Sequence, residues 1–481
     1  MNERTLDAAA FRRHAHELVD WMADYLEQIE QYPVKSQVEA REIYNQLPAS
    51  APQEAESMEA IFKDFQEVIL PGITHWQSPN FFSYFPANSS YASLLGEMLT
   101  ATLGAQCMIW ETSPAAAELE ERVMNWLREM IGLPEEFSGV IQSTASDGTL
   151  IAILTAREKA SNFQVNETGL RRHPQYRVYA SGQTHSSIEK AVKIAGLGRE
   201  NCVYVATDEN FAMDPAALQK TLQADLQAGV KPLCVVATLG TTSSTAVDPL
   251  EPIAKICQEY GVWLHVDAAY AGNALILPEY RDWIKGIEGV DSFVFNPHKW
   301  LFTNFDCTAY YVRSEEYLIR TFEILPEYLK TRNDKIVNNY RDWGIALGRR
   351  FRALKLWFVL RNFGVKGLQE KLRLHMQLGQ WLKEQVAAHP DFELLAPVPL
   401  NLVCFRYRPD EALSEAQLTQ LNQSIVQRLN DGGKIYLTHT KLNGIYTIRL
   451  VVGQTQVAQR HLEVAWELIV KTAKEAFHEM D

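Results

Sequence analysis

The chain has 481 residues, of which 47% are apolar and 22% are charged, a balance typical of a folded globular protein. This length exceeds what one compact core accommodates, so we expect two or three packed units. The formal net charge is -13, and so large a negative excess repels phosphate backbones. The composition therefore argues against nucleic acid as a partner.

The N-terminus and the cysteines indicate the cellular compartment. The first residues, MNERTLDAAAF, include acidic side chains and lack the apolar core of a secretory signal. No apolar run approaches the roughly 18–20 residues that a membrane span requires. The six cysteines form no CxxC pair, which is typical of reduced thiols. We therefore expect a cytoplasmic protein with no membrane partner.

Residues 7–30 are predicted to form a helix with one apolar stripe, which Pro33 ends. The stripe consists of Phe11, Leu18, Val19, Met22, Leu26 and Ile29. An apolar stripe packs against another apolar surface, and the sequence leaves two alternatives for it: a second subunit, or the chain's own domain. We treat residues 1–89 as an N-terminal helical arm. A second helix is expected over residues 115–131, ended by Gly132.

Between residues 140 and 313, short apolar runs alternate with amphipathic helical stretches. The predicted strands are 176–181, 202–207, 232–239, 262–268, 292–295 and 307–312. Asp214-Pro215 and Asp248-Pro249 are predicted to open helices, and Gly229 and Gly261 to end them. Strands that are apolar throughout, separated by crossover helices, predict an α/β fold with a mostly parallel sheet covered by helices. Ligands bind such sheets beyond the carboxyl ends of the strands.

After about residue 363 the pattern changes to a smaller α+β unit. We expect a long helix over 364–388, strands near 400–407, 434–438 and 445–452, and a final helix. The predicted organisation is thus an arm (1–89), a large α/β domain (90–362) and a small C-terminal domain (363–481).

Two residues that follow predicted strands suggest cofactor chemistry. The run VWLHVDAAYAG puts Asp267 where a buried strand ends, and the run SFVFNPHKWL puts Lys299 just past another strand, among aromatic side chains. Burial lowers the pKa of an amine and makes it nucleophilic toward an aldehyde. An aspartate one strand away is suited to hold a pyridine nitrogen protonated, as pyridoxal phosphate requires. A buried Asp–Lys ion pair is the alternative that these two residues alone leave open.

The stretch IQSTASDG (141–148) precedes a predicted helix and offers donors for a phosphate. Ala145 and Ser146 are expected at its first turn, where unpaired N–H groups and the helix dipole attract anions. The alternative is that Ser146 or Asp147 is an ordinary N-cap, and both roles can coexist. Thr241 and Thr242, after strand 232–239, are a second source of hydroxyl groups.

His185 directly follows strand 176–181, a position from which an imidazole can stack on a flat ring or transfer a proton near neutral pH. A purely structural histidine is the alternative. His265, Asp267 and His298 are also candidate metal ligands, but no further Cys/His cluster completes a site. We therefore predict no metal centre.

Taken together, the chain resembles the aromatic-L-amino-acid (DOPA/tryptophan) decarboxylases, group II pyridoxal-phosphate enzymes of fold type I. The resemblance keeps order and spacing over nearly the whole chain, whereas any single segment would be a weak match. The matching segments are HWQSPNFFSYFP (75–86), GVIQSTAS (139–146), THSS (184–187), VVATLGTT (235–242), WLHVDAAYAG (263–272), FNPHKW (295–300) and GRRFRALKLWF (348–358).

The resemblance implies roles for individual residues. Lys299 is expected to hold pyridoxal phosphate as a Schiff base, Asp267 to pair with its pyridine nitrogen, and His185 to stack on its ring. Tyr328 resembles the family's active-site loop tyrosine, expected with His185 to deliver the proton that makes the product an amine. The remaining cofactor contacts implied are Ala145, Ser146, Thr242, Asn296 and His298.

The resemblance also implies a small-molecule amino-acid substrate and a homodimer, in which the arm would cover the partner. The substrate contacts implied are Trp76, Tyr84, Phe85, Pro86, Ala87, Met108, His185 and Gly348. In the family that the chain resembles, a glycine at the position of Gly348 makes room for an aromatic ring, so the resemblance implies decarboxylation of tyrosine, DOPA, tryptophan or 5-hydroxytryptophan. Histidine decarboxylation, aldehyde synthesis and a non-catalytic dimeric module remain the alternatives.

Overall fold

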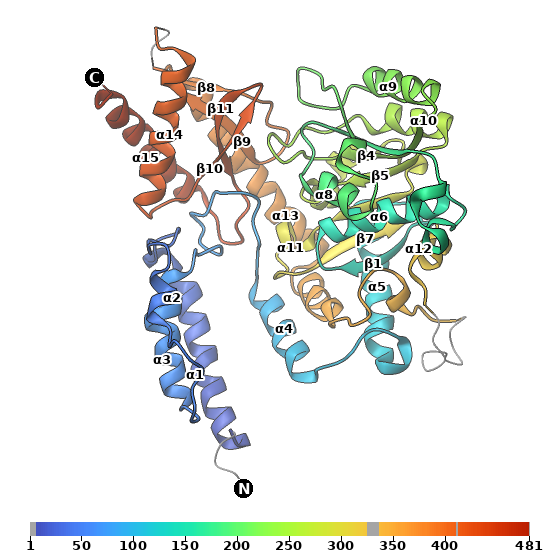
Figure 1. Cartoon of the computed structure of the whole chain (residues 1–481). Coiled ribbons are helices and arrows are strands. Elements are labelled where there is room, and N and C mark those ends of the chain that lie inside the picture. Colours follow the sequence, from blue (N-terminus) through green and yellow to red (C-terminus); the bar gives the residue numbers. More distant parts are fainter. Residues whose placement is uncertain (1–5, 325–335, 410–411, 481) are drawn as a thin grey trace. The chain divides into compact units, whose positions relative to one another are not determined.

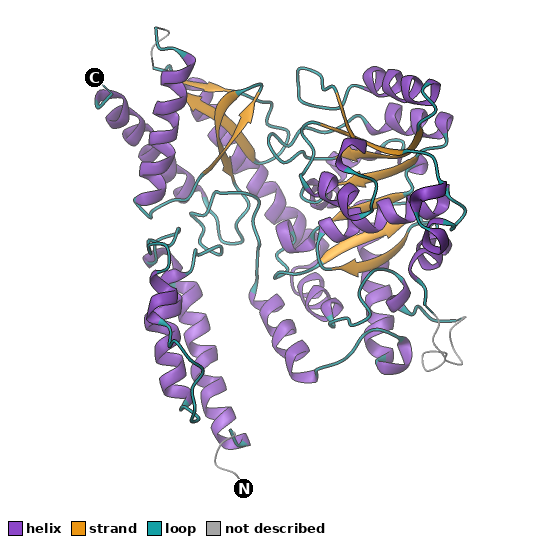
Figure 2. Cartoon of the chain, in the orientation of Figure 1, coloured by secondary structure: helices purple, strands orange, loops and turns teal. Residues whose placement is uncertain are grey.

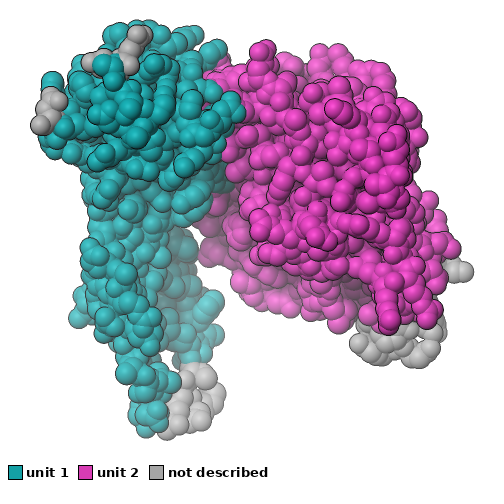
Figure 3. All heavy atoms as spheres, turned by 45° about the horizontal axis from the view of Figure 1, so that its top comes forward, with its two compact units in different colours: residues 1–86, 381–395, 405–481 teal, residues 87–380, 396–404 magenta. Residues whose placement is uncertain are grey.

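A computed structural model describes residues 6–324, 336–409 and 412–480. The chain folds into two compact units (Figure 3). Unit 1 contains residues 1–86, 381–395 and 405–481, and unit 2 contains residues 87–380 and 396–404. The predicted three-part division with boundaries after 89 and 362 stays a prediction.

Unit 2 is built on a seven-stranded sheet with the order β1-β7-β6-β5-β4-β2-β3 (Figure 1). Neighbouring strands from β3 to β6 run parallel, whereas β7 is antiparallel to both β6 and β1. This arrangement confirms the predicted α/β fold. The strands are β1 (Ser138–Gln142), β2 (Tyr176–Ser181), β3 (Cys202–Val205), β4 (Lys231–Thr238), β5 (Trp263–Asp267), β6 (Ser292–Phe295) and β7 (Thr308–Val312).

The strands form because their residues are apolar on both faces. Every residue of β5, β6 and β7 is buried, as expected for a sheet that helices cover (Figure 2). Helix α6 packs across β4, β5 and β6, and contacts α8 on the same face. The core there contains Ile151, Ile188, Val236 and Val294. Strand β1 was not among the predicted strands, because its sequence SGVIQ includes polar residues and a glycine.

The helices of unit 2 largely follow the predicted signals. Asp214 caps α9, accepting a hydrogen bond from the backbone N–H of Ala216, and Gly261 ends α10 with a positive φ of 63°. The helices are α4 (Tyr91–Leu103), α5 (Pro114–Ile131), α6 (Ala145–Ala160), α7 (Val165–Thr168), α8 (Ser187–Ile194), α9 (Pro215–Gln227), α10 (Leu250–Tyr260), α11 (Pro297–Trp300) and α12 (Glu315–Phe322).

A helix opens at Asp248-Pro249 as predicted, but Asp248 is not its N-cap. Pro249 is the N-cap of α10, and the buried Asp248 carboxylate accepts hydrogen bonds from the backbone N–H groups of Thr238 and Met213, both at 2.7 Å. Pro249 has no N–H group to donate to this carboxylate. Its two donors come instead from Thr238, the last residue of β4, and from Met213, in the loop after β3. Asp248 therefore ties the end of β4 to the loop that follows β3.

Helix α13 (Arg352–Ala388) begins earlier than predicted. It contains a kink at Gly364, where φ is 64°. The predicted helix over 364–388 covers the part after the kink and misses the part before it. A residue with positive φ interrupts the helical hydrogen bonds, and a glycine adopts that conformation most readily.

The second sheet has four strands in the order β10-β11-β9-β8. They are β8 (Phe392–Leu394), β9 (Leu402–Tyr407), β10 (Thr438–Leu442) and β11 (Ile445–Val451). The strand predicted over 434–438 is wrong, since β10 begins only at Thr438. Helices α14 (Glu415–Asp431) and α15 (Gln459–His478) pack on each other, and α14 also packs on β11. Helix α14 was not predicted.

The arm is formed by α1 (Ala8–Glu27), α2 (Glu42–Gln46) and α3 (Met58–Asp64). Trp21 of α1 packs edge-on against Phe62 and Phe65, with ring centroids 5.7 Å and 5.2 Å apart. Part of α1 therefore finds its partner within the arm. Phe11 and Val19 of the predicted stripe are 61% and 41% exposed, so this part of the stripe is uncovered in the single chain.

None of the described helices is long and apolar enough to cross a membrane. All six cysteines lie within the described ranges, and each is buried and unbonded to another cysteine. Within those same ranges, no group of three or more histidine, cysteine, aspartate or glutamate side chains is arranged to hold a metal ion.

Candidate active site

The carboxyl ends of β4, β5 and β6 bring two of the predicted residues to one edge of the sheet. Asp267, the last residue of β5, is the register partner of Thr238 in β4 and of Val294 in β6. Lys299 follows β6 by four residues, in the short helix α11. The parallel register therefore places the turn that carries Lys299 next to Asp267.

Asp267 is buried, with 4% of its surface exposed. Its Oδ1 accepts a hydrogen bond of 3.0 Å from the backbone N–H of Ala269. The turns after β5 and β6 are joined by a second bond, in which the backbone N–H of Asn296 donates to the carbonyl of Ala269. The carboxylate is therefore held rigidly beside the turn that leads to Lys299.

Lys299 is held at its backbone on both sides. Its N–H donates to the carbonyl of Asn296, and its own carbonyl accepts a bond of 2.7 Å from the side-chain amide of Asn88. Burial lowers the pKa of the Lys299 amine, and the Asp267 charge partly opposes that effect. A lowered pKa raises the fraction of neutral amine, which is the form that attacks an aldehyde.

His185 lies four residues past β2 and is oriented by its own backbone. The N–H of Ser187 donates to Nδ1 at 3.1 Å, and the hydroxyl of Ser187 lies 2.8 Å from the same atom. In the neutral ring the proton is therefore on Nε2. Burial lowers the pKa of His185, Asp267 raises it, and Lys299 lowers it. These opposing effects place the three predicted catalytic groups within electrostatic reach of one another.

The predicted phosphate turn precedes α6, but its N-cap is neither Ser146 nor Asp147. Thr144 is the N-cap, and Asp147 completes a capping box by accepting a bond from the backbone N–H of Thr144. Ala145 and Ser146 consequently occupy the first two helical positions. N–H groups at these positions have no acceptor within a helix, and their binding of a phosphate stays a prediction.

Thr242 lies in the loop between β4 and α10. The loop folds back on itself, because the N–H groups of Gly240 and Thr241 both donate to the carbonyl of Ala246. Asp248 closes the loop: its N–H donates to the carbonyl of Thr238, and its carboxylate accepts from the N–H of Thr238.

Asn296 and His298 both act on the turn around Lys299. The side-chain oxygen of Asn296 accepts a bond of 2.8 Å from the hydroxyl of Thr308. Nδ1 of His298 accepts a bond of 3.0 Å from the backbone N–H of Cys307. Burial and the neighbouring Lys299 lower the pKa of His298 to about 3, so its ring is neutral. Both side chains anchor the turn to β7 or to the segment that precedes it.

The predicted substrate residues fall in both units. Trp76, Tyr84, Phe85 and Pro86 belong to unit 1, whereas Ala87, Met108, His185 and Gly348 belong to unit 2. Trp76 stacks on Tyr84 with centroids 5.7 Å apart, so these rings form an aromatic cluster. Tyr328 lies outside the described residues, and its role stays a prediction.

Three residues near the site were missed by sequence reasoning. Asn88 holds the carbonyl of Lys299, and Arg349 with Glu120 forms a buried ion pair next to Gly348. The adjacent arginines in GRRF were a signal, because an arginine inside an otherwise apolar segment needs a buried partner. Asn88 gave no signal of its own in the sequence.

Trp300, the residue after Lys299, is fully buried and stacks on Tyr270 with centroids 4.7 Å apart. Its indole N–H donates to Nδ1 of His375 at 2.9 Å. Trp300 thus packs α11 into the core.

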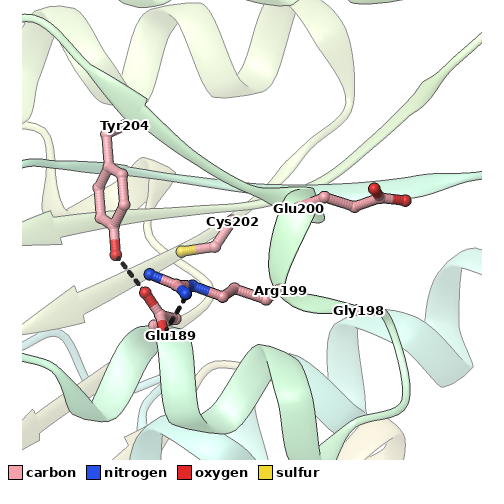
Figure 4. Close-up of a pocket in the computed structure, with 6 residues that line it drawn as sticks. All are labelled: Glu189, Gly198, Arg199, Glu200, Cys202 and Tyr204. Carbon is pink, nitrogen blue, oxygen red and sulfur yellow. Dashed lines mark hydrogen bonds and ion pairs between the residues drawn. The ribbon is translucent and has the colours of Figure 1, made fainter.

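A surface hollow of about 520 Å³ lies at the start of β3, lined by Glu189, Arg199, Cys202 and Tyr204 among others (Figure 4). The hydroxyl of Tyr204 donates to the Glu189 carboxylate at 3.2 Å, and Nε of Arg199 lies 3.2 Å from it. β3 is an edge strand, separated from β6 by β2, β4 and β5. The hollow is therefore distinct from the site at Lys299.

The chain matches the model of the pyridoxal-dependent decarboxylase conserved domain over residues 41–408. The chain belongs to this family. Within it, the chain is 41% identical to a tyrosine decarboxylase of Papaver somniferum, covering 97% of this chain and 95% of that protein. It is 42% identical to a phenylacetaldehyde synthase of Arabidopsis thaliana, covering 99% and 98%. The pyridoxal-dependent decarboxylases are carboxy-lyases, and so is this protein.

Solved structures of the family share the fold over nearly the whole chain. The Catharanthus roseus tryptophan decarboxylase in complex with L-tryptophan has a TM-score of 0.92 at 40% identity and covers 98% of this chain and 99% of its own. The Oryza sativa TDC with PLP and tryptamine has a TM-score of 0.95 at 37% identity, with the same coverage. The aromatic-amino-acid decarboxylase resemblance seen in the sequence is thereby confirmed.

The residues at the sheet edge fit pyridoxal phosphate. Lys299 supplies an amine with a lowered pKa, Asp267 a buried carboxylate beside it, and His185 a ring whose Nδ1 is already occupied. The first turn of α6 and the loop that carries Thr242 are the segments predicted to contact the phosphate. When bound, the cofactor supplies an electron-accepting ring, and the protein supplies its attachment, orientation and charge environment.

Proposed function

We propose that this enzyme decarboxylates aromatic L-amino acids, of the tyrosine, DOPA, tryptophan and 5-hydroxytryptophan class, to the corresponding amines and CO2. The observation that carries the proposal is that Lys299, Asp267 and His185 lie at one edge of the sheet. The charges of Asp267 and Lys299 both alter the pKa of His185 there. The names of the similar proteins, tyrosine and tryptophan decarboxylases, support the substrate class.

In this proposal Lys299 attaches the cofactor and releases it to the substrate amine. Asp267, fixed by the N–H of Ala269, keeps the pyridine nitrogen protonated, so that the electrons left by CO2 have an acceptor. His185 presents Nε2, since Nδ1 is held by Ser187. The neutral ring at this position is suited to stack on the cofactor and to take part in proton transfer.

The proton that completes the reaction decides its product. Protonation at the substrate's Cα gives the amine, and we propose that Tyr328 with His185 delivers it. The phosphate contacts proposed are Ala145, Ser146 and Thr242, with Asn296 and His298 supporting the turn around Lys299.

A second product outcome is supported by the phenylacetaldehyde synthase, which is as similar to this chain as the decarboxylases are. The chain retains both His185 and Tyr328, and this favours amine formation. Histidine as the substrate is disfavoured by the family resemblance, in which a glycine at the position of Gly348 leaves room for an aromatic ring.

We also propose that the enzyme is a cytoplasmic homodimer. One face of α4 exposes apolar side chains at helical spacing, and Phe11 and Val19 of α1 are exposed as well. The exposed residues of α4 are Tyr91, Leu95, Leu99 and Leu103. Such faces are typical of surfaces that a second subunit covers. The six buried cysteines, none of which is bonded to another cysteine, are consistent with a reducing compartment.

The substrate panel is the experiment that tests the function. Purified enzyme with pyridoxal phosphate is given tyrosine, DOPA, tryptophan, 5-hydroxytryptophan, histidine and glutamate, and amine, aldehyde, CO2 and peroxide are measured. We expect amine and CO2 in equal amounts from the aromatic amino acids. Aldehyde with peroxide as the main products would establish the second outcome, and turnover of histidine or glutamate alone would overturn the proposed substrate class.

A further inference from the structure

A buried ion pair, Arg349 with Glu120, joins four segments of unit 2. The Arg349 side chain is 6% exposed and that of Glu120 is 3% exposed. Nη2 of Arg349 donates to the Glu120 carboxylate and, at 3.2 Å, to the carbonyl of Ile141. Nη1 donates to the carbonyl of Tyr340 at 3.5 Å. One guanidinium thus contacts α5, the end of β1 and the turn η11 (Tyr340–Asp342).

The backbone of Arg349 extends this network to the segment that carries Met108. The N–H of Arg349 donates to the side-chain oxygen of Gln106 at 2.7 Å, and its carbonyl accepts from the N–H of Cys107 at 3.0 Å. The carbonyl of Met108 accepts a bond of 2.8 Å from the N–H of Arg341. These hydrogen bonds hold the residue after Gly348 against the residue before Met108.

The side chain of Arg349 fastens this pair of segments to the sheet. Glu120 accepts from the backbone N–H of Ile141 at 2.9 Å as well as from Arg349. Ile141 lies three residues before Thr144, which caps α6 and precedes the phosphate turn. The ion pair therefore links the proposed substrate residues Gly348 and Met108 to the strand that leads to the proposed phosphate site.

We propose that the Arg349–Glu120 pair is a specificity-determining positioning device that sets the place of Gly348 and Met108 relative to the cofactor turn, and so the size of aromatic ring the enzyme accepts. This rests on the proposed function, because it takes both residues as substrate contacts. Breaking the multipoint hold of Arg349 lets these segments move against β1. A buried carboxylate fixed by several donors holds its surroundings rigidly, whereas a lysine ammonium cannot reproduce the planar fork.

The test compares Arg349→Lys with a matched control, Arg157→Lys, in the holoenzyme. Arg157 also pairs with a buried carboxylate, Glu158, and donates to a carbonyl, that of Ala195, at 2.9 Å. Arg157 lies near the C-terminal end of α6, so Arg157→Lys removes a similar interaction away from the site. Glu120→Gln is the second variant, because glutamine retains one oxygen for Ile141 and Arg349 and replaces the other oxygen, with its charge, by an amide NH2 group.

We expect Arg349→Lys to change the ratio of kcat/KM for tryptophan to that for tyrosine by at least about fivefold, mainly through KM. Glu120→Gln should change the ratio in the same direction by less, and Arg157→Lys should leave it unchanged at a similar loss of Tm. An equal effect on both substrates, or an equal change of ratio in Arg157→Lys, would overturn the proposal. If Arg349→Lys does not fold, the ratio of kcat/KM for tryptophan to that for tyrosine in Glu120→Gln tests the proposal instead.

A second readout separates this proposal from the proposed function. Hydrogen exchange of the backbone N–H groups of Cys107 and Arg341 should accelerate in Arg349→Lys and stay unchanged in Arg157→Lys. Unchanged exchange in both variants would show that the pair does not hold these segments. If the wild-type enzyme decarboxylated no aromatic amino acid, the proposed function would fail while the exchange result still stood.

Discussion

Asp267 raises the pKa of Lys299 while burial lowers it, and burial has the larger effect. The amine is therefore more readily deprotonated than an ordinary lysine, whose pKa is 10.5. The same carboxylate is fixed by the N–H of Ala269 at 3.0 Å. One aspartate thus faces both the attachment point of the cofactor and, in the proposed function, its ring nitrogen.

The first prediction concerns the pH at which Lys299 accepts the cofactor. Only the neutral amine attacks the aldehyde, so the rate should rise with pH and then reach a plateau. The midpoint of that rise should lie below 10.5, the ordinary pKa of lysine. Rapid mixing of cofactor-free protein with pyridoxal phosphate, followed by absorbance, measures the rate. N-acetyl-lysine is the control in the same assay. A rate that kept rising together with that of the free amine would contradict the lowered pKa.

Asp267→Asn tests the charge beside the cofactor at constant shape. Asparagine still accepts from the N–H of Ala269, but it no longer stabilises a protonated pyridine nitrogen. We expect kcat to fall by at least about 100-fold, which corresponds to about 2.7 kcal/mol of lost transition-state stabilisation. Cofactor attachment, followed by its visible absorption, should persist. A kcat within a few-fold of the wild type would show that the ring nitrogen needs no carboxylate.

Asp248→Asn tests the buried carboxylate that closes the Thr242 loop. Burial raises the pKa of Asp248 from the ordinary 3.8 to about 7. Between these values the folded protein binds more protons than the unfolded one, so this group's contribution to stability falls as pH rises and is constant above about pH 7. Asparagine has no such dependence.

The Tm advantage of the wild type over Asp248→Asn should therefore shrink between about pH 5 and about pH 8. Thermal unfolding followed by circular dichroism at both pH values measures it. Asp214→Asn is the matched control, because Asp214 also accepts from a backbone N–H and asparagine caps a helix as well as aspartate does. An advantage that stayed constant or grew with pH for Asp248→Asn would contradict the raised pKa.

Tyr328→Phe tests which group completes the reaction. Removing one hydroxyl should leave CO2 release within about tenfold of the wild type, because general-acid delivery of the later proton is separate from loss of the carboxylate. The product should shift from amine toward aldehyde. Chromatography of the products from tyrosine under air, with peroxide measured in parallel, checks this. An amine yield equal to that of the wild type would remove Tyr328 from proton delivery.

Much of the fold and the places of the candidate site residues along it could be predicted from the sequence, because buried strands and the residues directly after them are local signals. β2 and β6 have the predicted bounds, and Asp267 and Lys299 lie at the strand ends as expected. β1 and β10 were missed or misplaced because each contains polar residues and takes its strand conformation from its partners. Local propensity does not describe such pairing.

The supporting residues of the site were harder to find, because their roles depend on contacts distant in sequence. Arg349 and Glu120 are 229 positions apart, and Asn88 reaches the carbonyl of Lys299 across 211 positions. The sequence indicated a helix start at Asp248, since an aspartate before a proline is a common opening signal. Only the folded structure shows that its carboxylate accepts hydrogen bonds from the backbone N–H groups of Thr238 and Met213.

The most direct test of the account is chemical mapping of the cofactor's attachment point. Holoenzyme is treated with borohydride, digested and analysed by mass spectrometry, with Lys299→Ala as the control. We expect one peptide, the one that contains Lys299, to carry the reduced pyridoxyl group, and the variant to lose both this label and its decarboxylase activity. Labelling at another lysine, or full activity in Lys299→Ala, would contradict the central claim that Lys299 holds the cofactor.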